Sequence, residues 1–238
     1  MATEALIKYF KKSLPKLASD YSWKIPPSLK EFGLKGEGYE PNKNLKFYFQ
    51  KKWKMASRSE KQEIAKIVVS DWGGVKANKP ETLQHYVDHI STSDSDMPLK
   101  GVASYSKILA IVDPLKFAIY DARVAVSLIA TQFLCENTPR VAFHYVPGRN
   151  KITGDNQGRG FVHHPVFTRK ALKGSGWNQI PSKDNYSQYI ETLLKVRDHL
   201  RSIDRFRETE LYDLEMSLFA NAEKLAAEAM EKAETRDG

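Results

Sequence analysis

The sequence predicts a mainly α-helical protein with about eight to ten helices and at most one minor β element. Apolar residues recur three and four positions apart over most of the chain, which is the spacing of one helix face. Ser57 followed by Glu60 matches a capping box, a pattern typical of helix starts. Strand-like alternation is confined to the run 141–146. The expected class is therefore a multi-helix fold.

Each predicted helix rests on its own apolar face. The first, over 3–18, has Leu6, Phe10 and Leu14 on one side. The run 23–42 is predicted to be irregular, because prolines and glycines interrupt it. The remaining predicted helices lie at 44–56, 57–70 and 81–90, as two helices within 99–133, and at 184–203 and 209–232.

Composition excludes several classes of protein. The single cysteine, Cys135, excludes an internal disulfide and a cysteine-based zinc site. There is no apolar run of about 18 residues and no signal-peptide pattern, so we expect a cytoplasmic, bacterial-type protein without a membrane partner. His85 and His89 have the spacing of zinc ligands but lack the glutamate of that motif and a third ligand, so no metal is expected. The glycine-rich run 147–160 lacks the order of a Walker loop, so no nucleotide and no other cofactor is expected.

Charge is distributed unevenly along the chain. The net charge is +8, but residues 204–238 hold ten acidic and five basic side chains, net −5, which leaves +13 for residues 1–203. We therefore expect a basic helical body over 1–203 and an acidic C-terminal helix over 204–238 that packs on it. A basic body favours nucleic acid as a partner, because clustered Lys and Arg displace counterions from phosphates. An acidic protein partner would explain the same excess.

The segment Gly101–Leu128 carries the strongest functional signal. An amphipathic helix follows the turn after Leu99 and ends at Asp113, because the next residue is proline. A short crossing then leads to Asp121, at the expected start of the next helix. Lys107 and Asp121 thus belong to two successive helices and form a plausible catalytic pair. The alternatives are a simple N-cap role for the aspartate and a solvated surface position for the lysine.

These residues resemble the helix-hairpin-helix DNA glycosylase superfamily. Ile119-Tyr120-Asp121 is similar to its aspartate motif, and Gly101-Val102-Ala103 to its glycine-containing hairpin turn. The resemblance implies a hairpin whose backbone amides hold a DNA phosphate, followed by an aspartate that opens the next helix. Lyase-type members also carry a lysine at the start of the hairpin's second helix. Lys107 is the candidate for that lysine, although a strict count from the turn places Tyr105 there.

The resemblance assigns roles to particular side chains. Asp121 and Lys107 are the predicted catalytic residues. The predicted DNA contacts are Lys100, Gly101, Ala103, Ser104, Ser106, Arg123, Arg149, Lys151 and Arg159. The predicted base-pocket residues are Trp23, Tyr39, Tyr105, Tyr120 and His163. Pairing with an acidic neighbour is the alternative for Arg123, and a structural role is the alternative for His163.

The implied function is excision of a modified or damaged base from duplex DNA, which leaves an abasic site. The enzyme would flip the base out of the helix, and the Asp121 carboxylate would stabilise the oxocarbenium-like sugar. We expect a monomer that catalyses simple hydrolysis, with strand nicking through Lys107 as a second route. The chain also looks like the bacterial antiviral glycosylases that remove glucosylated hydroxymethylcytosine from phage DNA. A non-catalytic DNA-binding module and a protein-interaction adaptor are the alternatives.

Overall fold

The computed structural model describes residues 2–90, 98–135, 138–155 and 158–235, and these residues are mainly helical. Eleven α-helices occupy the described ranges: α1 Ala2–Ser13, α2 Leu17–Asp20, α3 Tyr39–Met55, α4 Arg58–Lys66, α5 Pro80–Ile90, α6 Val102–Val112, α7 Ala122–Leu134, α8 Arg169–Gly174, α9 Asn185–Arg201, α10 Leu211–Ala220 and α11 Ala222–Glu234. In the same ranges, one parallel two-stranded sheet pairs β1 Val141–Ala142 with β2 Asn178–Gln179. The predicted class is confirmed at this level.

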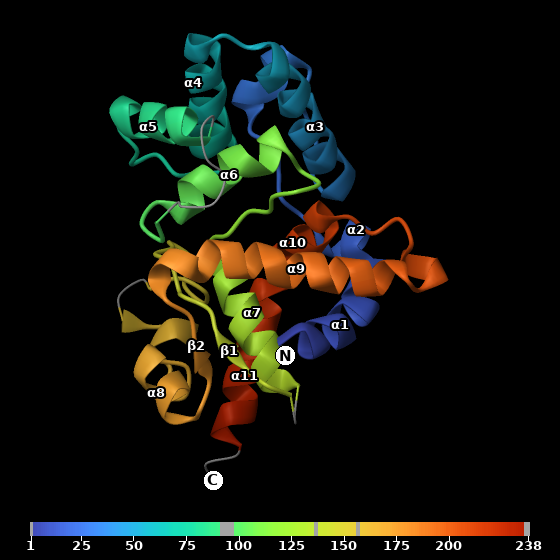
Figure 1. The fold of residues 1–238 in the computed structure, drawn as a ribbon, viewed down its shortest axis with the longest axis vertical. Helices are drawn as coiled ribbons and strands as arrows, with labels where there is room; N and C mark the ends of the chain where they lie inside the picture. The colour runs from blue at the N-terminus through green and yellow to red at the C-terminus, as the bar shows by residue number, and fades with distance from the viewer. Residues whose placement is uncertain (1, 91–97, 136–137, 156–157, 236–238) are drawn as a thin grey trace.

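The helices form two groups, one above the other (Figure 1). In the upper group α6 packs against α3 and α5, and α4 packs against α3 and α5. In the lower group α7 packs against α1, α10 and α11, and α9 lies along α1. The chain starts in the lower group, crosses to the upper one over 21–38 and returns over 113–121. Most buried side chains of both groups belong to one continuous apolar cluster, so the two groups share a core.

Two predicted helices are interrupted in the structure. The helix expected over 3–18 ends at Ser13, because Pro15 cannot donate a backbone hydrogen bond and a short 3-10 turn replaces the α-helix there. The helix expected over 209–232 breaks at Asn221, whose backbone and side-chain nitrogens both donate to the Ser217 carbonyl. The result is two shorter helices, α10 and α11, instead of one.

An acidic C-terminal helix that packs on the body was expected over 204–238; in the structure two helices of this region, α10 and α11, pack into the lower core. Leu211, Leu214 and Leu218 are fully buried, and α11 packs along α7. The predicted leucine stripe therefore closes the fold. The acidic excess of this region comes mainly from residues on the outer side of these helices, because Asp213 and Glu215 are the only buried carboxylates in its described part, 204–235.

The strand expected over 141–146 is limited to Val141–Ala142. Gln132 holds the start of this strand, since its side chain accepts from the Val141 amide and donates to the Val141 carbonyl. Beyond the strand, the Asn185 side chain accepts the His144 amide at 2.8 Å. Side chains thus satisfy backbone groups that a longer ladder would have paired.

The capping box at Ser57 and Glu60 is confirmed, with both reciprocal bonds present at the start of α4. The helix does not continue to residue 70 in α geometry. It passes into a π-helical turn over Ile67–Trp72, in which the Gly73 amide donates to the Val68 carbonyl at 3.0 Å. Such turns are uncommon and often lie at functional sites. This one ends at the boundary between the two helix groups.

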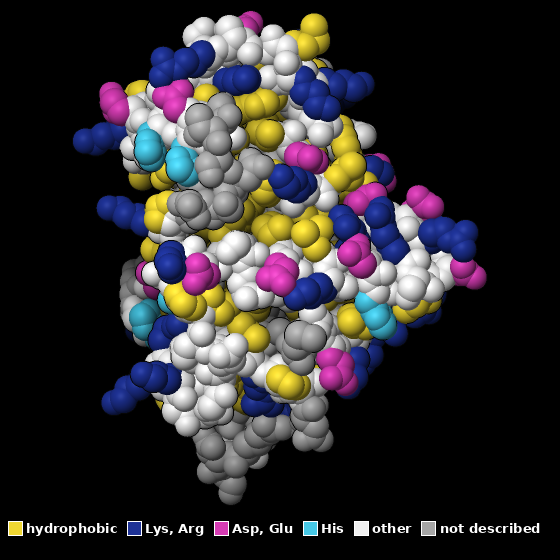
Figure 2. Space-filling view, in the orientation of Figure 1, with side chains coloured by type: hydrophobic (Ala, Val, Ile, Leu, Met, Phe, Trp, Pro, Cys, Tyr) yellow, Lys and Arg dark blue, Asp and Glu magenta, His cyan; other side chains and the backbone are white. Residues whose placement is uncertain are grey.

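The surface shows no single-sign patch on the face drawn in Figure 2, where basic and acidic side chains are interspersed. Among the described residues, no helix has the length and apolar character needed to cross a membrane.

Candidate functional site

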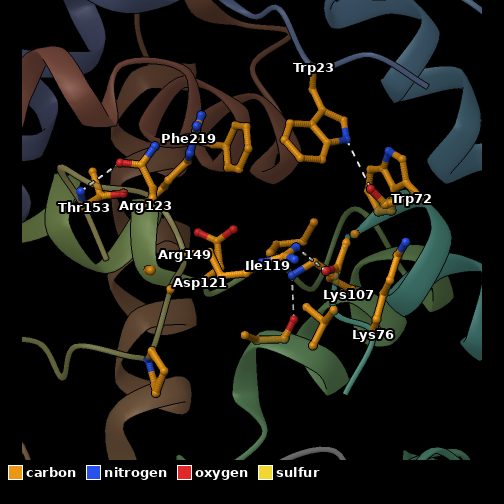
Figure 3. A pocket seen from close by; sticks show the side chains of 18 of the residues that line it. Trp23, Trp72, Lys76, Lys107, Ile119, Asp121, Arg123, Arg149, Thr153 and Phe219 are labelled. Carbon is orange, nitrogen blue, oxygen red and sulfur yellow. Dashed lines mark hydrogen bonds between the residues drawn. The ribbon is translucent and has the colours of Figure 1, made fainter. Parts of the chain in front are cut away.

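A pocket of about 1280 Å³ lies between the two groups of helices. Trp72, Lys76 and Lys107 lie on one side of it, and Asp121 and Arg123 on the other (Figure 3). The first three come from the π-helical turn, the segment after it and α6, and the last two from the start of α7. The pocket therefore gathers the two predicted catalytic residues, whose positions differ by fourteen in the sequence.

Lys107 is held inside the protein by its own helix. Gly101, in a left-handed conformation with φ of 88°, precedes α6, and Lys107 is the sixth residue of that helix, with only 5% of its surface exposed. Its Nζ donates to the Ala103 carbonyl at 2.6 Å. Burial lowers the pKa of this amine, because desolvation disfavours the charged form, and the nearby Asp121 carboxylate opposes that shift. The alternative of a solvated surface lysine is therefore wrong.

Gly73 packs directly on the hydrocarbon stem of Lys107. A Cβ atom at this position would lie 2.4 Å from Lys107 Cδ and 2.5 Å from Cε, well inside van der Waals contact. The same atom would lie 2.9 Å from the Val68 carbonyl oxygen. The absence of a side chain at residue 73 thus leaves the space that the lysine occupies.

Asp121 is both the N-cap of α7 and a wall of the pocket. Its Oδ1 accepts the Val124 amide at 3.1 Å, as a capping aspartate does. Its carboxyl group also lines the cavity that holds Lys107. Capping and a role in the pocket are therefore compatible, and the expected helix start is confirmed.

A second carboxyl group, that of Glu215, lines the same pocket from α10. It is 2% exposed and forms an ion pair with Lys46 of α3, which is 1% exposed. Burial raises the pKa of Glu215, and Lys46 opposes the rise. This pair joins α3 of the upper group to α10 of the lower group.

Aromatic side chains form one wall of the pocket. Trp23 meets Phe219 edge to face at 5.5 Å and donates from Nε1 to the Trp72 carbonyl. Asn42 fixes both tryptophans, since it accepts from Trp72 Nε1 at 2.8 Å and donates to the Trp23 carbonyl at 2.7 Å. Tyr21 also lines this wall, 5.8 Å from the Phe219 ring. The wall offers flat apolar surfaces on which a planar ring can stack.

The glycine-rich loop forms another edge. Arg149 donates to the Gly74 carbonyl at 2.7 Å and so links the loop to the upper group. Asn150 and Arg123 both donate to Glu223, each at 2.8 Å. The alternative of an acidic partner for Arg123 is therefore confirmed, although Arg123 also lines the pocket.

The structure separates the predicted DNA contacts into two sets. Ala103, Arg123 and Arg149 line the pocket, and Lys100, Lys151 and Arg159 are exposed outside it. Ser104 and Ser106 do not fit that role as side chains, because both are buried. Ser104 Oγ accepts from Asn78, and Ser106 Oγ accepts the Tyr120 amide.

The hairpin turn has part of its backbone already bonded. The Val102 amide donates to the Leu99 carbonyl, and the Ser104 and Tyr105 amides donate to the Gly101 carbonyl. Among the described residues, the amides of Gly101 and Ala103 remain for an incoming acceptor.

Of the predicted base-pocket residues, the structure brings only Trp23 to the pocket. Tyr105 and Tyr120 are fully buried in a cluster with Tyr186 and Tyr189, so they serve the core. The strict count that placed Tyr105 in the lysine position is therefore not supported by its location. His163 is exposed, and its Nε2 lies 3.4 Å from the Asp155 carbonyl oxygen.

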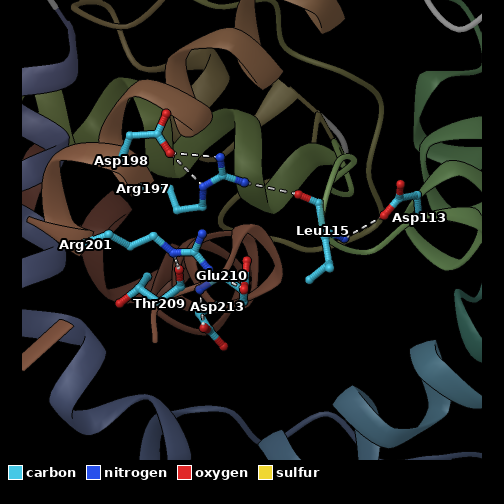
Figure 4. Close-up of polar contacts among 8 residues, drawn as sticks. All are labelled: Asp113, Leu115, Arg197, Asp198, Arg201, Thr209, Glu210 and Asp213. Atoms are coloured by element: carbon cyan, nitrogen blue, oxygen red, sulfur yellow. Dashed lines mark hydrogen bonds and ion pairs between the residues drawn. The ribbon is translucent and has the colours of Figure 1, made fainter. Parts of the chain in front are cut away.

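Tyr39 also lies away from the pocket lining. Its hydroxyl donates to Asp213 at 2.5 Å. Asp213 accepts the Glu210 amide, and Glu210 pairs with Arg201 at the end of α9 (Figure 4). Tyr39 therefore joins the start of α3 to α10 rather than contacting a base.

Sequence reasoning missed the pocket residues Glu215, Gly73 and Phe219. Glu215 had a usable signal, since it lies four residues after Leu211 and three before Leu218, on the apolar stripe. An acidic residue at such a position needs a buried partner. Gly73 was recognised only as part of a turn.

Among the described residues, no group of three or more His, Cys, Asp or Glu side chains lies close enough to hold a metal ion. Comparisons with family models, curated proteins and solved structures found no match.

Proposed function

We propose that the protein is a DNA glycosylase of the helix-hairpin-helix type, which excises a modified or damaged base from duplex DNA. One observation carries the proposal: Lys107 and Asp121 line the same pocket, with the amine buried and its pKa lowered. An amine of this kind is a nucleophile at lower pH than a solvated lysine. A carboxylate beside it can stabilise positive charge that develops on a sugar.

Three features of the pocket and its hairpin support this chemistry. A flipped base can stack on the aromatic wall of Trp23 and Phe219, and its sugar then lies toward Asp121. The exposed Lys76 and Arg149 lie at the edge of the same pocket, where they can meet backbone phosphates. The amides of Gly101 and Ala103, which have no acceptor among the described residues, suit a phosphate at the hairpin turn.

Two reaction routes use these residues. In the hydrolytic route water attacks C1′ of the sugar while Asp121 stabilises the oxocarbenium-like transition state. In the amine route Lys107 Nζ forms a bond to C1′ as the bond to the base breaks. The bonding pair leaves with the base, which takes up a proton. Loss of a proton from nitrogen and opening of the C1′–O4′ bond then give a Schiff base. The buried position of Lys107 supports the amine route.

Base release from DNA tests the proposal. Wild type, Asp121→Asn and Lys107→Met are incubated with duplexes that carry damaged bases or glucosylated hydroxymethylcytosine, and abasic sites are scored before and after alkali. We expect release by wild type and loss in Asp121→Asn, which keeps a capping side chain. Strand breaks without alkali, absent in Lys107→Met, support the amine route. No release from any duplex contradicts the proposal. Preferred release of the glucosylated base supports a role in defence against phage.

A non-catalytic DNA-binding module is the second candidate. The capping bond from Val124 to Asp121 favours it, because that bond alone accounts for an aspartate at this position. In that case Asp121→Asn leaves DNA affinity unchanged and neither protein releases a base.

A further inference from the structure

Lys107 shares its pocket with three carboxyl groups, of which those of Asp121 and Glu215 act on its charge, and it hydrogen-bonds to neither of these two. Its Nζ donates instead to a neutral acceptor, the Ala103 carbonyl of its own helix. A buried ammonium group is ordinarily stabilised by a carboxylate partner, because desolvation of an isolated charge is costly. The arrangement around Lys107 therefore needs an explanation.

Both carboxyl groups are engaged elsewhere. Asp121 accepts the Val124 amide at the start of α7. Glu215 accepts from Lys46, and the two side chains are 2% and 1% exposed. Lys46 belongs to α3 of the upper group and is not among the residues that line the pocket. It therefore pairs with Glu215 without entering the pocket.

We propose that Lys46 is a positioning residue for Lys107: by pairing with Glu215 it keeps that carboxylate from Lys107 and leaves the Lys107 amine available as a nucleophile. The proposal rests on the proposed function in the role that it gives to Lys107. The ion pair between Lys46 and Glu215 and the position of the Lys107 amine do not depend on the proposed function.

The charges that face Lys107 explain why Lys46 affects the protonation of its amine. Asp121 and Glu215 favour the ammonium form, whereas Lys46 and burial disfavour it. When all four groups are ionised, the charges of Lys46 and Lys107 balance those of Asp121 and Glu215. Without Lys46, Lys107 is the other buried cation that acts on Glu215. The other charged or titratable groups that line the pocket are Tyr21, Lys76, Arg123, Arg149 and Asp155.

The test measures the titration of Lys107 directly. Folded protein is labelled with a trace of acetic anhydride at a series of pH values, and acetylation of the peptide that contains Lys107 is quantified by mass spectrometry. In Lys46→Met the midpoint of labelling should move to higher pH by roughly 1–3 units, the effect of an adjacent opposite charge. In Glu215→Gln it should move to lower pH. In the double variant, which removes both charges, it should stay near that of wild type.

An unchanged midpoint in Lys46→Met overturns the proposal. If Lys46→Met does not fold, the labelling midpoints of Glu215→Gln and the double variant decide. Equal midpoints in Glu215→Gln and wild type then overturn the proposal. A purely structural role for the pair would lower stability without opposite shifts in these variants.

Because the labelling uses no DNA, its outcome is independent of the proposed function. On a duplex that wild type cleaves, the acidic limb of the pH-rate profile should move in Lys46→Met in the same direction as the labelling midpoint. Opposite labelling shifts without base release by wild type would support the positioning role of Lys46 and contradict the glycosylase.

Discussion

A methyl group at residue 73 should disturb the side chain of Lys107 more than it disturbs the other neighbours of Gly73. In Gly73→Ala the new Cβ would lie 2.4 Å and 2.5 Å from two carbons of the Lys107 stem, and 2.9 Å from the Val68 carbonyl oxygen. Overpacking of this kind in a buried site costs about 1–3 kcal/mol. Two of the three contacts belong to Lys107, so most of this cost should depend on its side chain.

A double-mutant cycle measures that dependence. The free energy of unfolding is determined in urea for wild type, Gly73→Ala, Lys107→Ala and the double variant. Truncation of Lys107 removes Cδ and Cε, so Gly73→Ala should cost less than about half as much in the Lys107→Ala background as in wild type. Lys107→Met keeps heavy atoms at both positions and should give no such relief.

Gly174→Ala is the matched control, because a Cβ there meets no atom within 4 Å and Gly174 closes a helix. It should be neutral or slightly stabilising. Equal costs of Gly73→Ala in the wild-type and Lys107→Ala backgrounds would refute the reasoning, since the clash would then not involve the lysine.

Three further outcomes follow from the site. Asp121→Ala should lower the free energy of unfolding by about 0.5–2 kcal/mol through loss of the cap bond to Val124, whereas Asp121→Asn should cost a few tenths, as measured in urea. The lowered pKa of Lys107 means that the unfolded chain binds the extra proton between that pKa and 10.5, so stability at this site rises with pH in that window. Lys107→Met should lack this rise in urea titrations from pH 7 to 9.5. If Lys76 and Arg149 contact phosphates, alanine at either position should reduce the slope of log affinity for DNA against log salt by about 0.9; an unchanged slope excludes that contact.

Local features of the site were predictable from the sequence. Asp121 opens α7 because its side chain caps the third residue after it, and this needs only neighbours in sequence. The capping box of Ser57 and Glu60 is equally local. Lys107 belongs to the same segment as Asp121, so the pair could be proposed before its geometry was known.

Features that depend on distant partners were not predictable. Tyr105 and Tyr120 look like pocket aromatics, but they bury against Tyr186 and Tyr189, which follow much later in the chain. Sequence spacing does not show whether such a side chain points into the pocket or into the core. Glu215 and Lys46 lie 169 positions apart, and neither position identifies its partner.

The glycine-rich loop illustrates a different limit. Three of its basic residues were predicted to contact DNA, yet the described part of the loop is held by bonds within the protein. Asn150 accepts the amides of Ile152 and Thr153, and Arg149 reaches the Gly74 carbonyl. A run of glycines indicates that the backbone can come close to another surface, but it does not show whether that surface belongs to DNA or to the protein itself.

The π-helical turn at Ile67–Trp72 makes one wall of the pocket sensitive to chain length. Its bond from Gly73 to Val68 spans five residues where an α-helix spans four, so the turn contains one residue more than regular geometry needs. Deletion of a single residue there would let the helix run on regularly and would turn Trp72 and Gly73 by about 100° around its axis. The Trp72 carbonyl would lose its hydrogen bond from Trp23, and a residue other than Gly73 would face the stem of Lys107. Insertions and deletions in this turn should therefore be far less tolerated than substitutions, even though the turn contributes neither of the two proposed catalytic residues.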